Sequence, residues 1–220
     1  MHWILGRRAR FGLALFAAAA IGLPSQLDAQ TTLGVKGGIG ITDLSVENSE
    51  GISSRTSFTG GGFAQFMLGE QFFVQPEVLY APKGAKYSDL SVEGTYELDY
   101  VEIPVLFGAQ FGVGQGLTPR IFAGPAVSFE VGCSVSGEAE GVSASVDCGD
   151  FGLETKSVDF GVVFGAGLGI PVGDFDIIID GRYDLGLTNI DDTDYEFESD
   201  SSAKNRAWQF MAGVGFPVGG

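Results

Sequence analysis

The sequence predicts an all-β protein, an eight-stranded antiparallel up-and-down transmembrane β-barrel with short periplasmic turns and long outer loops. Three observations predict this fold: an export leader, segments of alternating hydrophobicity, and connections that alternate between short and long. Alternation at a period of two is typical of strands, because successive side chains leave opposite faces. In a barrel that spans a membrane, the apolar face meets lipid and the other face lines the lumen.

The first 29 residues have the layout of a secretory signal. Arginines within residues 7–10 precede an apolar run, residues 11–23, and the small residue Ala29 follows. The run is shorter than the roughly 17–25 residues of a membrane helix, so cleavage is favoured over an uncleaved anchor. We therefore expect residues 1–29 to be removed after export, and residues 30–220 to form one barrel domain.

Segments of alternating hydrophobicity recur along the rest of the chain. In residues 100–112, YVEIPVLFGAQFG, every second residue from Val101 to Phe111 is apolar, whereas the other set includes Glu102. Several segments reach thirteen residues, well beyond the usual five to six or so of soluble strands. The predicted strands are about 32–44, 57–69, 71–82, 95–111, 119–131, 156–170, 175–189 and 204–217.

The connections between these segments alternate in length. Residues 69–70 and 172–174 are tight turns, and 112–118 is short and uncharged. An outer-membrane barrel has short turns at its periplasmic end and longer loops outside, which is the arrangement found here. The predicted outer loops are 45–56, 83–94, 132–155 and 190–203.

The two faces of the predicted strands differ in chemistry, and this difference sets their orientation. One face is consistently apolar, and the other combines glycine and small residues with scattered charges, which suits the crowded inside of a small barrel. A soluble lipocalin-like barrel is the alternative, and it would bury the apolar set inside. We expect the following residues to face lipid: Val101, Ile103, Val105, Phe160, Phe164, Ile177, Ile179 and Phe210; and these to face the lumen: Glu77, Glu102, Asp180, Arg182 and Gln209.

Charged residues on inward positions predict an ion-pair network. Two cations and three carboxylates would meet in a narrow space where an unpaired charge is costly. We expect the network to be centred on Arg182, to join opposite walls and to close the channel. Its predicted members are Lys36, Glu77, Glu102, Asp180 and Arg182.

Several of these segments also carry a resemblance to a known family. QPEVLYAPKG, YVEIPVLFG, VDFGVVFGAGLGIP and DGRYDLGLTNI follow in order, and together they resemble the porin-like or PorT-like outer-membrane β-barrels, similar in architecture to OmpA-type barrels. The resemblance implies an outer-membrane location and an eight-stranded meander, with no shared catalytic motif. Such barrels usually end on an aromatic residue for the insertion machinery. This chain instead ends Phe216-Pro217-Val218-Gly219-Gly220, so Phe216 would have to serve.

The residue inventory argues against enzymatic activity. The single histidine is His2, inside the predicted leader, so Ser–His and Cys–His nucleophiles are excluded from the mature chain. Glu77 and Glu102 form a possible carboxylate pair, which we interpret as packed interior groups because a filled eight-stranded lumen has little room for a substrate. The alternating glycines at 165–169 lie within a predicted strand and are interpreted as packing residues. No cofactor is expected.

Both cysteines, Cys133 and Cys148, fall in the predicted loop 132–155. An even count in an oxidising compartment predicts a disulfide, for which a metal site is the alternative.

The mature chain is strongly acidic. Residues 1–29 carry three arginines and one aspartate, so their removal takes the net charge from −16 to −18 and excludes nucleic-acid binding. The densest acidic stretch, Asp191 to Asp200, is interpreted as a solvated loop, with calcium binding or ion bridging to lipopolysaccharide as the alternatives.

These observations predict a small non-enzymatic outer-membrane barrel with a structural or porin-like role. The expected partners are outer-membrane lipids, lipopolysaccharide and the barrel-insertion machinery, and the expected state is a monomer. Two alternatives remain at this stage: transport or binding of a small hydrophobic ligand through the barrel, and a soluble secreted barrel.

Overall fold

The computed structural model describes residues 31–45, 52–89, 92–112, 116–139, 142–151, 157–188 and 204–218. The predicted leader and the acidic stretch 191–200 lie outside these residues. No helix in the described part of the chain is long and apolar enough to cross a membrane.

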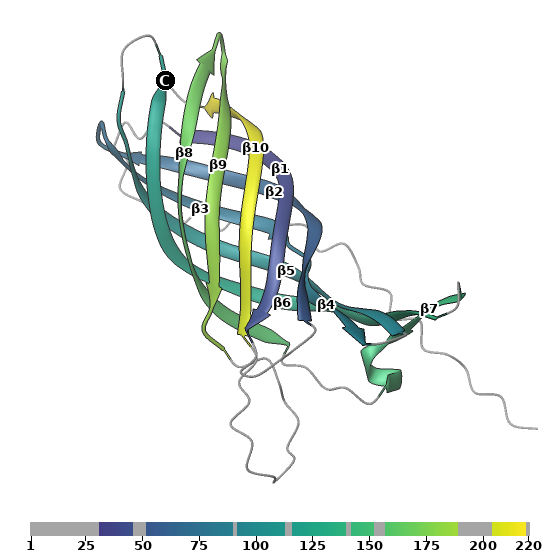
Figure 1. Ribbon diagram of the computed structural model, residues 1–220. Coiled ribbons are helices and arrows are strands. Elements are labelled where there is room, and N and C mark those ends of the chain that lie inside the picture. Colours follow the sequence, from purple (N-terminus) through teal and green to yellow (C-terminus); the bar gives the residue numbers. More distant parts are fainter. Residues whose placement is uncertain are drawn as a thin grey trace, which may run out of the picture.

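The described chain is nearly all strand (Figure 1). One short 3₁₀ helix, η1 (Cys148–Phe151), follows β7. The strands are β1 (Thr31–Ser45), β2 (Ile52–Leu68), β3 (Phe72–Tyr80), β4 (Lys83–Asp89), β5 (Val92–Gln110), β6 (Thr118–Ala139), β7 (Val142–Asp147), β8 (Val158–Val172), β9 (Phe175–Gly186) and β10 (Lys204–Val218).

Eight antiparallel walls close into a barrel. β3 and β4 together form one wall, because both pair with β2 on one side and with β5 on the other. The remaining walls are β1, β2, β5, β6, β8, β9 and β10, and the pairing of β1 with β10 closes the ring. The predicted eight-stranded meander is therefore confirmed.

The short turns, the start of β1 and the end of β10 all lie at the same end of the barrel. Gly69 and Gly173 adopt φ values of 84° and 63° in the β2–β3 and β8–β9 turns, a conformation that suits glycine because it has no Cβ. β1 begins and β10 ends at this side too, where Thr31 pairs with Val218 (Figure 1). This side corresponds to the periplasmic end of an outer-membrane barrel.

Three of the predicted outer loops are wrong in part, because strands run through them. Within 45–56, β2 already begins at Ile52 and pairs with β4. Within 83–94, β4 and β5 continue their ladder to the pair Asp89–Val92. Within 132–155, β6 runs to Ala139 and pairs with β7, so this hairpin extends beyond the barrel (Figure 1). In these segments the backbone pairing continues, although the hydrophobic alternation that marked the strands has stopped.

A disulfide joins Cys133 and Cys148, as predicted, with 5.5 Å between the two Cα atoms. Cys133 lies in β6 and Cys148 begins η1, so the bond fixes the end of the β6–β7 hairpin to β6 itself. Closing a loop of about fifteen residues stabilises a fold by about 3 kcal/mol in the chain-entropy model.

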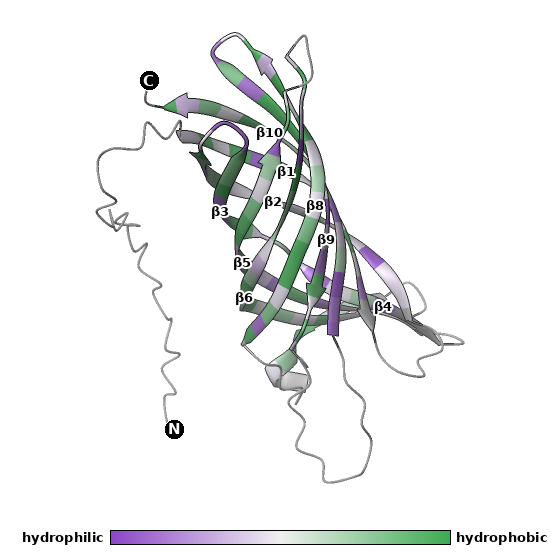
Figure 2. Cartoon of the chain, turned by 90° about the vertical axis from the view of Figure 1, so that its left-hand side faces the viewer, coloured by the Kyte–Doolittle hydropathy of each residue, from purple (hydrophilic) through white to green (hydrophobic). Residues whose placement is uncertain are grey.

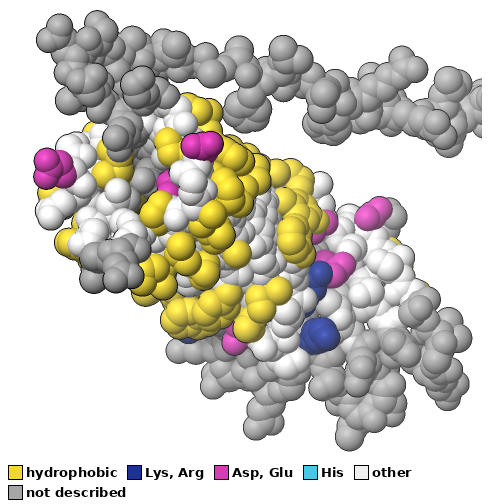
Figure 3. Space-filling view, turned by 90° about the horizontal axis from the view of Figure 1, so that it is seen from above, with side chains coloured by type: hydrophobic (Ala, Val, Ile, Leu, Met, Phe, Trp, Pro, Cys, Tyr) yellow, Lys and Arg dark blue, Asp and Glu magenta, His cyan; other side chains and the backbone are white. Residues whose placement is uncertain are grey.

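The alternating faces have the predicted orientation. Glu102 and Arg182 are fully buried, whereas Phe160 and Phe210 on the opposite face are 58% and 49% exposed. Green and purple alternate along several strands in Figure 2, and hydrophobic side chains gather over the wall seen in Figure 3. The apolar face is therefore the outer one, as a lipid-facing barrel requires and a soluble lipocalin-like barrel does not.

The interior is layered along the barrel axis. An apolar cluster of Phe73, Leu106, Phe122, Ala126 and Val163 occupies the half near the short turns. A smaller cluster of Leu98 and Tyr100 lies in the other half. The buried charged residues lie between and around these clusters.

Candidate functional site

Glu77 on β3 accepts contacts from three side chains inside the barrel. Its Oε1 lies 2.6 Å from Lys36 Nζ and 2.6 Å from Gln75 Nε2, and its Oε2 lies 2.7 Å from Arg182 Nη1. All these donors come from strand positions with the same inward alternation. Glu77 is 1% exposed, and the three donors compensate for much of the hydration free energy that its carboxylate loses on burial.

Arg182 on β9 is fully buried, and its guanidinium reaches residues of three other strands, β10, β3 and β5. It donates to Gln209 Oε1 from Nε at 2.8 Å and from Nη2 at 2.6 Å, and to Glu77 from Nη1. Its Nη2 also lies 3.7 Å from Glu102 Oε1. The planar fork of arginine suits this arrangement, because its donors point in fixed directions.

Lys83 on β4 forms a second centre that the sequence analysis did not predict. Its Nζ lies 2.7 Å from Asp184 Oδ2 and 3.1 Å from Glu102 Oε2, and its side chain is 3% exposed. Lys83 was expected in the outer loop 83–94. Odd-numbered residues of β3 from Phe73 to Leu79 are buried, and continuing that alternation past Pro82 would have placed Lys83 inside.

Arg120 on β6 extends the network towards the short-turn end. It donates to Gln75 Oε1 at 2.5 Å, and its Nε lies 3.8 Å from Asp180 Oδ1. Its guanidinium carbon lies 4.7 Å from the ring centre of Phe73 and 5.7 Å from that of Phe122. Cation–π contact with two rings favours the charged guanidinium in an otherwise apolar layer.

These contacts form one continuous chain of ion pairs, which we call the lumen network. Lys36 joins its two parts, because Lys36 Nζ contacts Glu77 and also lies 3.2 Å from Asp180 Oδ2. The structure therefore brings all five predicted members together and adds Lys83, Arg120 and Asp184. The complete network has four cations and four carboxylates: Lys36, Lys83, Arg120 and Arg182 with Glu77, Glu102, Asp180 and Asp184.

Two of the ion pairs cross the full width of the barrel. The walls β3/β4 and β9 are four strands apart in either direction around the ring of eight. Glu77 on β3 contacts Arg182 on β9, and Lys83 on β4 contacts Asp184 on β9. Both pairs therefore tie walls that face each other across the lumen.

Further polar side chains are buried near the network. Asn205 Nδ2 donates to Asp159 Oδ2 at 2.9 Å, and Ser128 lies between Lys83 and Glu102. Within the described residues, no group of three or more His, Cys, Asp or Glu side chains has a geometry that could hold a metal ion.

A polar vestibule of about 200 Å³ lies at the short-turn mouth of the lumen. It is lined by side chains that include Gln65, Gln110 and Thr118, and it ends at Arg120. The vestibule gives solvent at this end access to the edge of the lumen network.

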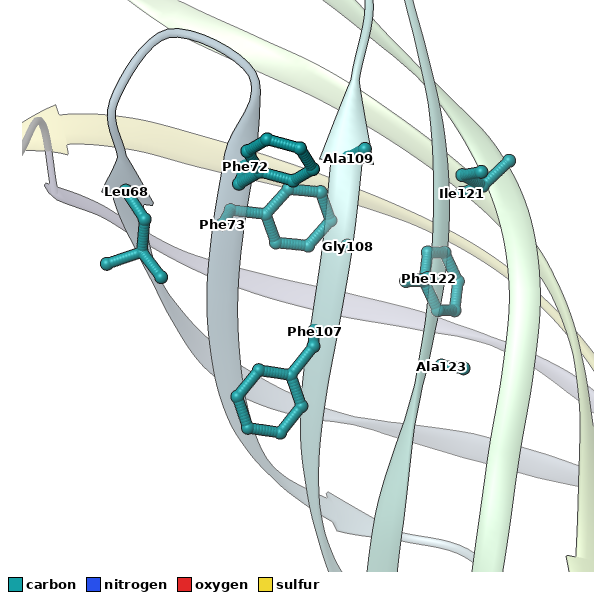
Figure 4. Close-up of a pocket in the computed structure, with 9 residues that line it drawn as sticks. All are labelled: Leu68, Phe72, Phe73, Phe107, Gly108, Ala109, Ile121, Phe122 and Ala123. Carbon is teal, nitrogen blue, oxygen red and sulfur yellow. The ribbon is translucent and has the colours of Figure 1, made fainter.

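A lateral groove of about 570 Å³ lies in the outer wall near the same end. Figure 4 shows its lining, which comes from β2, β3, β5 and β6 and is almost wholly apolar. The lining residues are Leu68, Phe72, Phe73, Phe107, Gly108, Ala109, Ile121, Phe122 and Ala123.

Comparison with known proteins identifies the family. A family model described as an outer membrane protein beta-barrel domain matches residues 25–192. The chain belongs to this family. No curated protein matches it. Membership confirms the resemblance inferred from the sequence motifs and assigns the chain to the bacterial outer membrane.

Solved structures share the barrel at low sequence identity. The outer membrane protein W of E. coli is 14% identical, with a TM-score of 0.50 and coverage of 86% of this chain and 98% of that one. OprG of Pseudomonas aeruginosa is 10% identical, with a TM-score of 0.49 and coverage of 87% and 98%. The outer membrane enzyme PagL is 13% identical, with a TM-score of 0.44 and coverage of 84% and 99%.

Proposed function

We propose that this protein is a non-enzymatic outer-membrane barrel whose lumen network closes the channel to ions and solutes. The observation that carries the proposal is the pair of contacts between opposite walls, Glu77–Arg182 and Lys83–Asp184. Ion pairs at this position narrow the lumen, and they hold the opposite walls at a fixed separation.

The charge balance supports a permanently closed arrangement. Within the network four cations face four carboxylates, and the buried Asp159 beside it accepts a hydrogen bond from Asn205. Most members are at most 3% exposed, and breaking one buried pair costs about 3–5 kcal/mol. Opening a water-filled pore would require several such pairs to separate together.

The arrangement of the carboxylates supports a role without catalysis. Glu77 contacts both Lys36 and Arg182, which favours a stable carboxylate over one half of a general acid and base pair. The mature chain also has no histidine, because His2 lies in the predicted leader. The lining of the vestibule includes Arg120 and neither Glu77 nor Glu102.

The outer surface supports lipid as the main partner of a monomeric barrel. Tyr183 and Trp208 contact each other across β9 and β10 with ring centres 4.9 Å apart, and Phe164 extends the row on β8. These aromatic rings lie on the apolar outer face, which meets lipid in an outer-membrane barrel. Contacts with lipopolysaccharide, engagement of the insertion machinery through Phe216 and removal of residues 1–29 complete the proposal.

Conductance across a planar lipid bilayer tests the closed lumen. We expect the wild-type barrel to show no steady single-channel conductance, and the double variant Arg182→Ala/Lys83→Ala to conduct. Arg206→Ala is the matched control, because Arg206 is exposed on the outer face of β10 and should leave conductance at the wild-type level. Steady channels formed by the wild-type protein would overturn the proposal.

A further inference from the structure

The lateral groove has a shape that is open to lipid and closed towards the lumen. Ala109 and Ala123 are outward-facing and small, while Phe72, Phe107 and Ile121 are large and stand around them (Figure 4). At Gly108 the wall carries no side chain, and the ring of Phe73 lies behind it, since a Cβ at Gly108 would lie 2.3 Å from that ring. The result is a depression whose floor is the barrel backbone.

The dimensions of the groove suit a single hydrocarbon chain. Its lining crosses four strands, which are about 4.8 Å apart, so it extends about 14 Å across the wall. Along the strands it extends two residue steps, or about 7 Å. A rigid depression of this size leaves its lining without contacts unless an apolar group fills it.

The position of the groove indicates which molecule fills it. The groove continues the lipid-facing surface and lies beside the β2–β3 turn, so it faces the leaflet on the periplasmic side. The two short connections that flank it, residues 69–71 and 111–118, carry a single charge, that of Glu70. Glu70 is exposed in the turn, and a carboxylate there attracts an ammonium group and repels an anionic headgroup.

We infer that the groove binds one acyl chain of a phospholipid with a primary-amine headgroup, whose ammonium pairs with Glu70. The acyl chain of the lipid packs on Ala109 and Ala123 and against the Phe72 and Phe107 rings. This binding does not depend on whether the lumen is closed, because the groove opens on the outer face of the barrel.

The bound acyl chain is also connected to the lumen network through two aromatic side chains. Phe73 and Phe122 form the inner boundary of the groove, and the same two rings contact the Arg120 guanidinium. A lipid seated in the groove therefore supports the rings that hold this end of the network.

Native mass spectrometry of the full-length purified barrel tests the inference. The protein is incubated in detergent micelles with equimolar phosphatidylethanolamine and phosphatidylglycerol of identical acyl chains. We expect the wild type to retain one phosphatidylethanolamine. Filling the groove with Ala109→Phe/Ala123→Phe should weaken this retention at least about tenfold. Ala212→Phe is the control, because Ala212 is exposed on the outer face of β10, which pairs with β1 and β9 and with none of the strands that line the groove.

Glu70→Gln tests the headgroup separately. We expect it to reduce the preference for phosphatidylethanolamine over phosphatidylglycerol while the acyl chain is still retained. The inference is overturned if the wild type retains neither lipid, if the filled variant retains as much as the control, or if the groove is occupied by a free fatty acid or a second barrel. Equal retention of both lipids by the wild type would overturn the role of Glu70.

Discussion

Removing Arg182 should destabilise the barrel more than removing the charge of Glu102. Arg182 is fully buried, contacts Glu77 at 2.7 Å and supplies two hydrogen bonds to Gln209. Arg182→Ala deletes a cation from a balanced network and also leaves the Gln209 oxygen without these donors. Glu102→Gln keeps the shape of the side chain and removes only its charge.

The structure allows the two costs to be compared. Loss of one partner from a buried ion pair costs about 3–5 kcal/mol, which is the range that we expect for Arg182→Ala. After Glu102→Gln, Lys83 keeps Asp184 at 2.7 Å and Arg182 keeps Glu77 at the same distance. The expected cost is then about 1–3 kcal/mol, typical of hydrogen bonds to charged groups.

Unfolding by denaturant in lipid vesicles, followed by fluorescence, measures both effects. Trp208 is the only tryptophan beyond residue 29, so the signal reports on β10. Arg206→Ala is the control for loss of an arginine and should change the free energy of unfolding by less than about 0.5 kcal/mol, as surface substitutions usually do. The reasoning fails if Arg182→Ala costs no more than Glu102→Gln.

Other positions give sharp contrasts in the same assays. Phe164→Arg, near the middle of a lipid-facing strand, should cost about 2–4 kcal/mol of unfolding free energy, and an unchanged value would argue against a lipid-facing wall. Gly108→Ala should destabilise the barrel by about 1–3 kcal/mol, because its Cβ would lie 2.6 Å from a backbone oxygen. Gly62→Ala is its control, since its nearest contact would be an ordinary 3.6 Å. Cys133 and Cys148 should resist thiol labelling until a reductant is added, and labelling of the untreated protein would contradict the disulfide.

The strands and their orientation could be predicted because they depend on local patterns. Each strand repeats the same alternation, and a one-residue shift would place charges such as Glu102 in lipid, so the two faces are unambiguous. The disulfide followed from composition and compartment. The strand ends beyond the membrane were missed at the start of β2, at β4 and at the β6–β7 hairpin, because hydrophobic alternation marks contact with lipid and stops where backbone pairing still continues.

Alternation along each strand is enough to predict which side chains face the lumen. Which of them contact one another follows from the folded barrel. The pairing of Lys83 with Asp184 depends on the closure of the ring, which brings β4 and β9 to opposite sides of the lumen at one height. The lateral groove likewise depends on the register that places Gly108 beside Phe73 and Phe122. Alternation is a property of neighbours in the chain, whereas contacts across a barrel depend on strand register and ring closure, which a single strand does not contain.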